Sequence, residues 1–156
     1  IITFADCPGY LPGVVQEHGA IIRHGSKLLF AFSEATVPKI TVVVRKNYGG
    51  GYSAMLAQGL GADYLVALPT AEIAVMGAEG AVNMIYRDVI KDSVNPEEMR
   101  CKLIEDYRKK FATPYKAAEF GLVNDVIDPA ELRSYLIEYP IINTQFPMIK
   151  FAACNW

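Results

Sequence analysis

Three consecutive glycines, Gly49, Gly50 and Gly51, mark a place in this sequence where backbone groups could take part in chemistry. They separate the apolar run ITVVVR from the segment YSAM, where a buried strand is expected to give way to a helix. The first N–H groups of a helix have no partner within it, and the helix dipole adds partial positive charge there. Gly50 and Gly51 could therefore donate to an oxyanion, with Gly49 making the turn. The structural alternative is that all three only form a sharp turn or allow close packing.

A second irregular segment, DCPGYLPG at residues 6–13, follows another apolar run. Its prolines and glycines fix the shape of a loop beside the ring of Tyr10; they are Pro8, Gly9, Pro12 and Gly13. Ligands of open parallel sheets bind outside the carboxyl ends of the strands, so both corners should open onto the same edge. Taken alone, this loop is equally consistent with an ordinary connection from a strand to a helix.

Side chains that could form a catalytic triad or a metal site are not arranged for either role. His18 and His24 are six residues apart, which places them on different faces of a helix, and we expect them to be solvated or in an interface. Ser53 does not lie in a G-x-S-x-G turn, so a nucleophilic serine is not expected. The three cysteines, Cys7, Cys101 and Cys154, have no zinc-ligand or disulfide-framework spacing. We expect no metal and a reducing, cytoplasmic setting.

Composition limits the classes of partner. The 156 residues suit one domain, and 52% of them are apolar with a mean hydropathy of +0.19, which points to buried subunit contacts. No apolar run is long enough to cross a bilayer, so membrane insertion is not expected. The net charge of −2, with both signs interspersed, gives no sign of nucleic-acid binding.

The elements that must position these corners alternate along the chain. Strands are expected at residues 1–6, 39–45, 63–69, 72–76 and 122–127, the first buried on both faces. Helices are expected at residues 17–35, 77–86, 96–112, 114–121 and 129–138, with a further short one after the three glycines. Asn95 and Asp128 are the expected caps of two of them. This order predicts an α/β fold with a mainly parallel sheet, and residues 139–156 show no clear period.

Taken in order, three segments carry a resemblance to a known family. They are residues 6–55, from DCPGYLPG to NYGGGYSAM, then GADY at 61–64, then PTAEIAVMGAEGAVNMIY at 69–86. Together they resemble the carboxyltransferase (beta) subunit of biotin-dependent acyl-CoA carboxylases, of the propionyl-CoA carboxylase and methylmalonyl-CoA decarboxylase type. The resemblance runs from Ile1 to about Leu132. It implies a ClpP/crotonase-like fold in which residues 1–138 are part of the C-terminal carboxyltransferase domain and residues 139–156 are a divergent tail.

The resemblance also implies roles for site residues. Gly50 and Gly51 match an oxyanion pair, whose second member is often alanine, for the ureido oxygen of biotin or else the thioester enolate. Pro8, Gly9, Tyr10, Pro12 and Gly13 match the loop that lines the biotin pocket. Tyr52 and Ser53 match positions of acyl specificity, and Ser53 stands where propionyl-CoA-preferring members carry an aspartate. The α-proton can pass to biotin itself, so the chemistry requires no acid or base side chain.

The expected function is carboxyl transfer between carboxybiotin, carried on a partner protein, and a short-chain acyl-CoA. Expected partners are biotin carrier and biotin carboxylase subunits and further copies of the subunit, in a hexamer. One alternative is the reverse direction, in a decarboxylase or transcarboxylase. The other is an inactive or purely structural piece of such an assembly, because the family's N-terminal domain and the opening strands of its C-terminal domain have no counterpart in this sequence.

Overall fold

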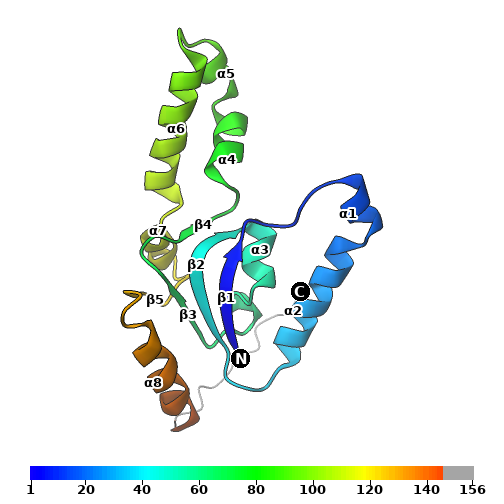
Figure 1. Cartoon of the computed structure of the whole chain (residues 1–156), viewed down its shortest axis with the longest axis vertical. Helices are drawn as coiled ribbons and strands as arrows, with labels where there is room; N and C mark the ends of the chain where they lie inside the picture. The colour runs from blue at the N-terminus through cyan, green and yellow to red at the C-terminus, as the bar shows by residue number, and fades with distance from the viewer. Residues whose placement is uncertain (146–156) are drawn as a thin grey trace.

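A five-stranded parallel sheet forms the centre of the molecule (Figure 1). The computed structural model describes the backbone of residues 1–145 and the side chains of residues 1–139. The strands are β1 (Ile2–Cys7), β2 (Ile40–Tyr48), β3 (Tyr64–Ala67), β4 (Glu72–Ala74) and β5 (Asp125–Val126). Their order is β1-β2-β3-β5, with β4 paired to the end of β2, and every pair is parallel. The predicted α/β class and parallel sheet are confirmed.

Strand β2 lies at the centre of the sheet. Its β-branched residues suit this place, since they are buried on both faces, as with the fully buried Val42 and Val43. Residues 40–43 pair with β1 on one side and β3 on the other, and residues 46–48 then pair with β4. The pairing with β1 shifts register between Ala5 and Cys7, so that Cys7 lies opposite Asn47. The carboxyl ends of β1 and β2 therefore reach the same edge of the sheet.

Strand β1 corrects one prediction. Its residues alternate between exposed and buried, with Ala5 fully buried and Ile2 and Phe4 about half exposed at 48% and 55%. The prediction of burial on both faces is wrong in this chain, because β1 is an edge strand with helical cover on one face only.

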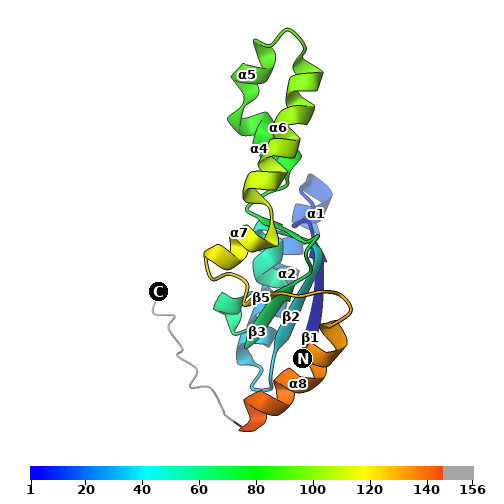
Figure 2. The ribbon, with the colours of Figure 1, turned by 90° about the vertical axis from the view of Figure 1, so that its left-hand side faces the viewer.

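Two layers of helices cover the sheet (Figure 2). Helices α3 (Gly49–Ala54) and α7 (Pro114–Glu119) pack on the face that contains Val43 and Leu65. Helix α8 (Leu132–Gln145) packs on the face that contains Val42, Val66 and Ile127, through its own Leu132, Tyr135 and Leu136. The short 3-10 helix η1 (Gln58–Leu60) follows α3.

The helix predicted at residues 17–35 is two helices, α1 (Val14–His18) and α2 (Ile21–Glu34). Ala20, at the break, has a left-handed backbone with φ of 57°, which is rare for a residue other than glycine. No residue pattern in the sequence predicts this conformation. The helix predicted to start at residue 129 starts at Leu132 instead. Asp128 accepts from the Ala130 N–H at 2.8 Å and so caps a turn before that helix.

A helical arm stands away from the sheet, at the top of Figure 1. Its three helices are α4 (Ala78–Ile85), α5 (Arg87–Lys91), which was not predicted, and α6 (Pro96–Phe111), which runs back antiparallel to the other two. Ala78, Val82 and Ile104 form its small core. Asn95 caps α6 as predicted, accepting from the Glu98 N–H at 3.4 Å. Of the tail at residues 139–156, the part up to 145 continues α8, and the rest lies outside the described residues.

Candidate active site

The three glycines lie where β2 ends and α3 begins. Gly49 has φ of 50°, and a Cβ there would lie 2.6 Å from the Val75 carbonyl oxygen, so only glycine fits the turn. Gly50 is exposed and Gly51 is buried. Within residues 1–145, neither Gly50 nor Gly51 has an acceptor for its N–H, and no side chain caps α3. The turn thus presents two unpaired amides at the carboxyl edge of the sheet.

The loop at residues 6–13 packs directly on this turn. A Cβ on Gly51 would lie 2.8 Å from Cys7 Sγ and 3.1 Å from the Cα of Gly9. Gly9 and Gly13 have φ of 120° and 143°, which L side chains rarely adopt, so both glycines are required by the backbone. The prediction that the two corners share one sheet edge is confirmed.

Tyr10 joins the two corners through its ring. The ring lies 3.4 Å from the position that a Cβ on Gly50 would occupy. The hydroxyl end of the ring lies against Gly25 of α2, where a Cβ would collide with the Tyr10 hydroxyl. Tyr10 therefore fills the space between α2 and α3 and covers one side of the exposed Gly50.

The remaining predicted site residues lie farther along α3 or on the loop surface. Tyr52 is partly buried, and its hydroxyl donates to the Leu122 carbonyl at 2.9 Å, beside α7. Burial raises the pKa of Tyr52. Ser53 is partly buried, whereas Pro8 and Pro12 are exposed. The structure brings Gly9 and Tyr10 to the glycine turn and directs the Tyr52 hydroxyl elsewhere.

His18 and His24 are both exposed, on α1 and α2 respectively. Neither lies in the glycine turn or in the loop at residues 6–13, and among the described residues neither belongs to a group that could hold a metal ion. Their exposure agrees with the prediction that they are solvated or lie in an interface.

A network of four polar side chains lies beside the turn, and the sequence analysis did not predict it. The buried Tyr48, directly before the glycines, donates through its hydroxyl to Glu72 Oε2. Glu72 Oε1 lies 3.8 Å from Arg108 Nε, and Arg108 also pairs with Glu79. Burial and, next, the bond to Glu72 raise the pKa of Tyr48. No local sequence pattern predicts this group, because its members come from four separate elements, β2, β4, α4 and α6.

Asn47 is the second feature that the sequence did not reveal. It is fully buried between Cys7 of β1 and Ile73 of β4, its partners in the two neighbouring strands. Within the described residues, neither its amide nitrogen nor its amide oxygen has a hydrogen-bond partner. A buried amide of this kind costs free energy that a bond would have offset.

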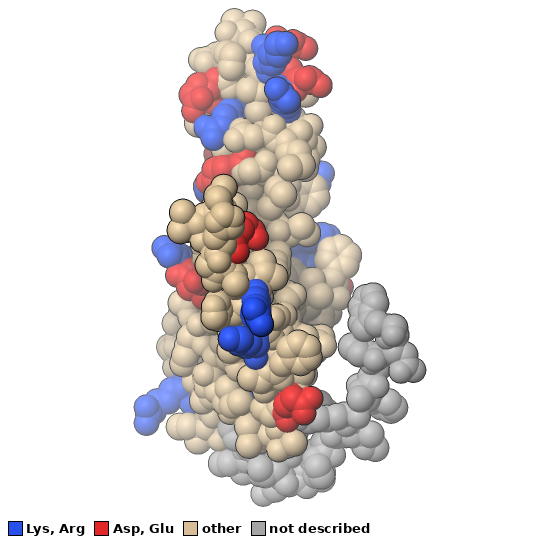
Figure 3. Space-filling model, turned by 90° about the vertical axis from the view of Figure 1, so that its right-hand side faces the viewer, with Lys and Arg blue, Asp and Glu red and all other residues tan. Residues whose placement is uncertain are grey.

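One ion pair lies where the loop at residues 6–13 begins. Arg45 Nη2 lies 2.8 Å from Asp6 Oδ2, and the Lys46 N–H donates to Asp6 Oδ1 at 3.1 Å. The bond from Arg45, followed by that from Lys46, lowers the pKa of Asp6. Across the face seen in Figure 3, acidic and basic side chains are interspersed, without a continuous patch of one sign.

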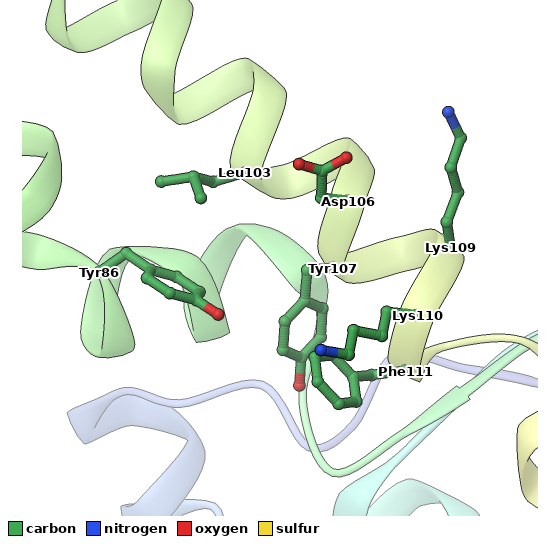
Figure 4. A pocket seen from close by; sticks show the side chains of 7 residues that line it. All are labelled: Tyr86, Leu103, Asp106, Tyr107, Lys109, Lys110 and Phe111. Atoms are coloured by element: carbon green, nitrogen blue, oxygen red, sulfur yellow. The ribbon is translucent and has the colours of Figure 1, made fainter.

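A hollow of about 420 Å³ lies along α6 (Figure 4). Lys110 Nζ lies 5.2 Å from the centre of the Phe111 ring in its wall. Its lining residues are Tyr86, Leu103, Asp106, Tyr107, Lys109, Lys110 and Phe111, and none of them is a predicted site residue. Residues 1–145 contain no cluster of potential metal ligands and no helix that could span a membrane.

Comparison with known proteins gives consistent matches. Residues 1–153 match the family model described as the carboxyl transferase domain. The chain is 57% identical over 137 residues to the carboxyltransferase subunit of propionyl-CoA carboxylase from Haloferax mediterranei, covering 88% of this chain and 27% of that protein. It is 60% identical over 133 residues to the methylmalonyl-CoA carboxyltransferase 12S subunit of Propionibacterium freudenreichii, covering 85% and 25%. It is 54% identical over 138 residues to the methylmalonyl-CoA decarboxylase alpha subunit of Propionigenium modestum, covering 88% and 27%.

A solved structure also matches closely. The transcarboxylase 12S hexamer, with methylmalonyl-coenzyme A and methylmalonic acid bound, superposes with a TM-score of 0.87 and 52% identity. The superposition covers 99% of this chain and 30% of that one. The chain thus spans about a quarter of the length of the curated relatives that it matches.

Proposed function

Since this chain belongs to the carboxyl transferase domain family and has the predicted crotonase-like fold, we propose that it takes part in carboxyl transfer between carboxybiotin and a short-chain acyl-CoA. The names of its relatives support the substrate class, because they specify propionyl-CoA or methylmalonyl-CoA. The chain covers about a quarter of those proteins, so it would supply part of a larger active site.

The single observation that carries the proposal is the pair of unpaired amides at Gly50 and Gly51. In this proposal they donate to the ureido oxygen of biotin, on which negative charge gathers as the carboxyl group leaves. The thioester enolate of the acyl-CoA is the other candidate acceptor. One preorganised donor of this kind is worth about 2.7–4 kcal/mol in an enzyme site.

The loop at residues 6–13 would hold the biotin ring beside these amides. Tyr10 places one edge of its ring next to the exposed Gly50, and Gly9 keeps the loop close to Gly51. These residues suit a small, uncharged ring with one polar edge. Bound carboxybiotin would supply the carboxyl group, and this chain would orient the ring and stabilise the charge on its oxygen.

Tyr52 and Ser53 remain our candidates for influencing acyl choice. Both are partly buried in the helix that begins at the amide pair. The Tyr52 hydroxyl is already bonded to Leu122, so its influence on the acyl group would come through the position of α3. Ser53, in place of an acid, would leave this part of the site uncharged.

We also propose partners for this chain. Exposed apolar side chains such as Ile2, Phe4 and Phe30 would be buried against further protein, in line with a homo-oligomer such as a hexamer. Biotin carrier and biotin carboxylase subunits would bring and recharge the cofactor. We further propose that the complex works in the cytoplasm.

The decarboxylase relative favours one competing direction, release of the carboxyl group from methylmalonyl-CoA. The genomic neighbourhood distinguishes the two. A biotin carboxylase gene beside this one favours carboxylation, and a membrane sodium-pump subunit favours decarboxylation.

A chimera tests whether this chain is competent for transfer. Residues 1–132 replace the matching segment of the 12S subunit from Propionibacterium freudenreichii, and carboxyl transfer from methylmalonyl-CoA to biotin is measured. We expect the rate to stay within about tenfold of the unmodified subunit, a change of about 1.4 kcal/mol in the barrier. A chimera that assembles normally yet transfers nothing would instead support an inactive, structural role.

A further inference from the structure

The glycine turn has no side chains of its own to hold it. Glycine has the greatest backbone freedom of any residue, so three in a row need anchors on either side. Both flanking residues are tyrosines, Tyr48 and Tyr52, and each donates its hydroxyl to a different part of the fold. We infer that Tyr48 and Tyr52 are positioning residues, which together fix the orientation of the peptide groups at residues 49–51.

Tyr48 anchors the turn on its β2 side. It is only 6% exposed and serves as the residue before the first turn of α3. Its ring lies 3.3 Å from the position of a Cβ on Gly77, and its hydroxyl donates to Glu72 Oε2. Ring and hydroxyl are therefore both fixed, so the carbonyl that Tyr48 contributes to the start of α3 has a fixed direction.

Tyr52 anchors the turn on its α3 side. Its ring packs on the sheet core that includes Val43 and Leu65, and its hydroxyl reaches the Leu122 carbonyl at 2.9 Å. This carbonyl belongs to the loop before β5, on a different part of the structure from Glu72. The two hydroxyl bonds thus hold opposite ends of the turn from independent supports.

Arg108 extends the first anchor into the helical arm. Its Nε lies 3.8 Å from Glu72 Oε1, and it also pairs with Glu79 of α4. The carboxylate that receives the Tyr48 hydroxyl is therefore itself oriented by α6. Raised pKa values of Tyr48 and Tyr52 are consistent with both remaining hydrogen-bond donors at neutral pH.

This positioning role deepens the proposed function and rests on it, because it affects chemistry only if Gly50 and Gly51 donate to an oxyanion. Preorganised donors are effective because they need no rearrangement when charge develops. Without the anchors the glycines would sample several orientations, and the pair would lose that advantage.

Backbone relaxation of the 156-residue chain tests the inference independently of activity. Y48F and Y52F each remove one hydroxyl and leave the ring. We expect the amide order parameters of Gly49, Gly50 and Gly51 to fall from about 0.85 to below about 0.6. Matched controls are Y135F, which removes a hydroxyl bonded to the Asp125 carboxylate, and Y139F, which removes one bonded to the Asp63 carbonyl. Neither control should change the three glycines.

A second variant, Glu72→Leu, removes the acceptor and leaves Tyr48 intact, so it should mobilise the glycines as Y48F does. Unchanged glycine order parameters in Y48F, Y52F and Glu72→Leu would overturn the inference, as would an equal loss in Y135F. Either result would leave the oxyanion proposal standing. Conversely, the glycines could become mobile in these variants while removal of their N–H groups leaves carboxyl transfer intact. The positioning role of the two tyrosines would then stand, and the oxyanion proposal would be wrong.

Discussion

Gly51 and Gly9 approach so closely that a Cβ on Gly51 would lie 3.1 Å from the Gly9 Cα. This contact joins the end of β2 to the loop that follows β1, and it places the biotin loop of our proposal against the amide pair. Backbone atoms cannot move aside as the end of a side chain can, so an alanine at position 51 would force these backbone atoms and Cys7 Sγ to shift. The family resemblance allows alanine at this position, and here Cys7 occupies part of the space that it would need.

Gly51→Ala should therefore destabilise the chain. We expect overpacking to lower the free energy of unfolding by about 1–3 kcal/mol, measured by urea denaturation. Gly59→Ala is the control, because a Cβ at the exposed Gly59 meets nothing within 4 Å. The double variant Cys7→Ala, Gly51→Ala should recover part of the loss, since Cys7 Sγ is the nearest atom. Equal stability of Gly51→Ala and the wild type would contradict the close contact.

Asn47→Leu should stabilise the chain. The substitution replaces a fully buried amide, unpartnered among the described residues, with an apolar group of similar size. We expect the free energy of unfolding to rise by about 1 kcal/mol, as an unsatisfied polar group is removed. Asn124→Leu is the contrasting variant and should destabilise, because the Oδ1 of this exposed residue accepts from the Leu65 N–H at 2.8 Å. Destabilisation of both variants to the same degree would show that Asn47 does have a partner in solution.

Asp6 should make the chain sensitive to acid. Its pKa is lowered in the folded state by Arg45 and the Lys46 N–H, so its contribution to stability is present above its unfolded pKa of about 3.8. That contribution is lost as the pH falls through the lower folded value. Asp6→Asn removes the titration, so the drop in unfolding midpoint between pH 6 and pH 3 should be smaller in the variant. An identical drop in both proteins, with 20 mM salt to limit screening, would show that the pair does not form.

Features of the fold that depend on local sequence signals could be predicted. Apolar runs marked the strands, and Asn95 followed by proline and two acids marked the start of α6, which the structure confirms. The strand-to-helix position of the three glycines likewise identified the turn. By contrast, the break at Ala20 requires a left-handed alanine, a conformation that no residue pattern there favours.

Contacts between distant segments could not be predicted in the same way. The chain from Tyr48 through Glu72 to Arg108 depends on how β4 pairs with β2 and where α6 returns to the sheet. The exposure of Phe4 was mispredicted for a similar reason, because it depends on which strand lies at the edge rather than on the apolar run. Thus the sequence located the amide pair, but not the side chains that hold it.

The central claim is that the Gly51 N–H donates to an oxyanion, and an ester in place of that one peptide bond tests it most directly. The exchange, made in the chimera with glycolic acid at position 51, removes the N–H without adding a side chain to the crowded site. The same exchange at Gly59, in open surroundings, is the control. We predict that the single-turnover rate of carboxyl transfer falls by about 10²–10³-fold for position 51 and remains unchanged for position 59. A folded position-51 ester that transfers the carboxyl group at the wild-type rate would contradict the account.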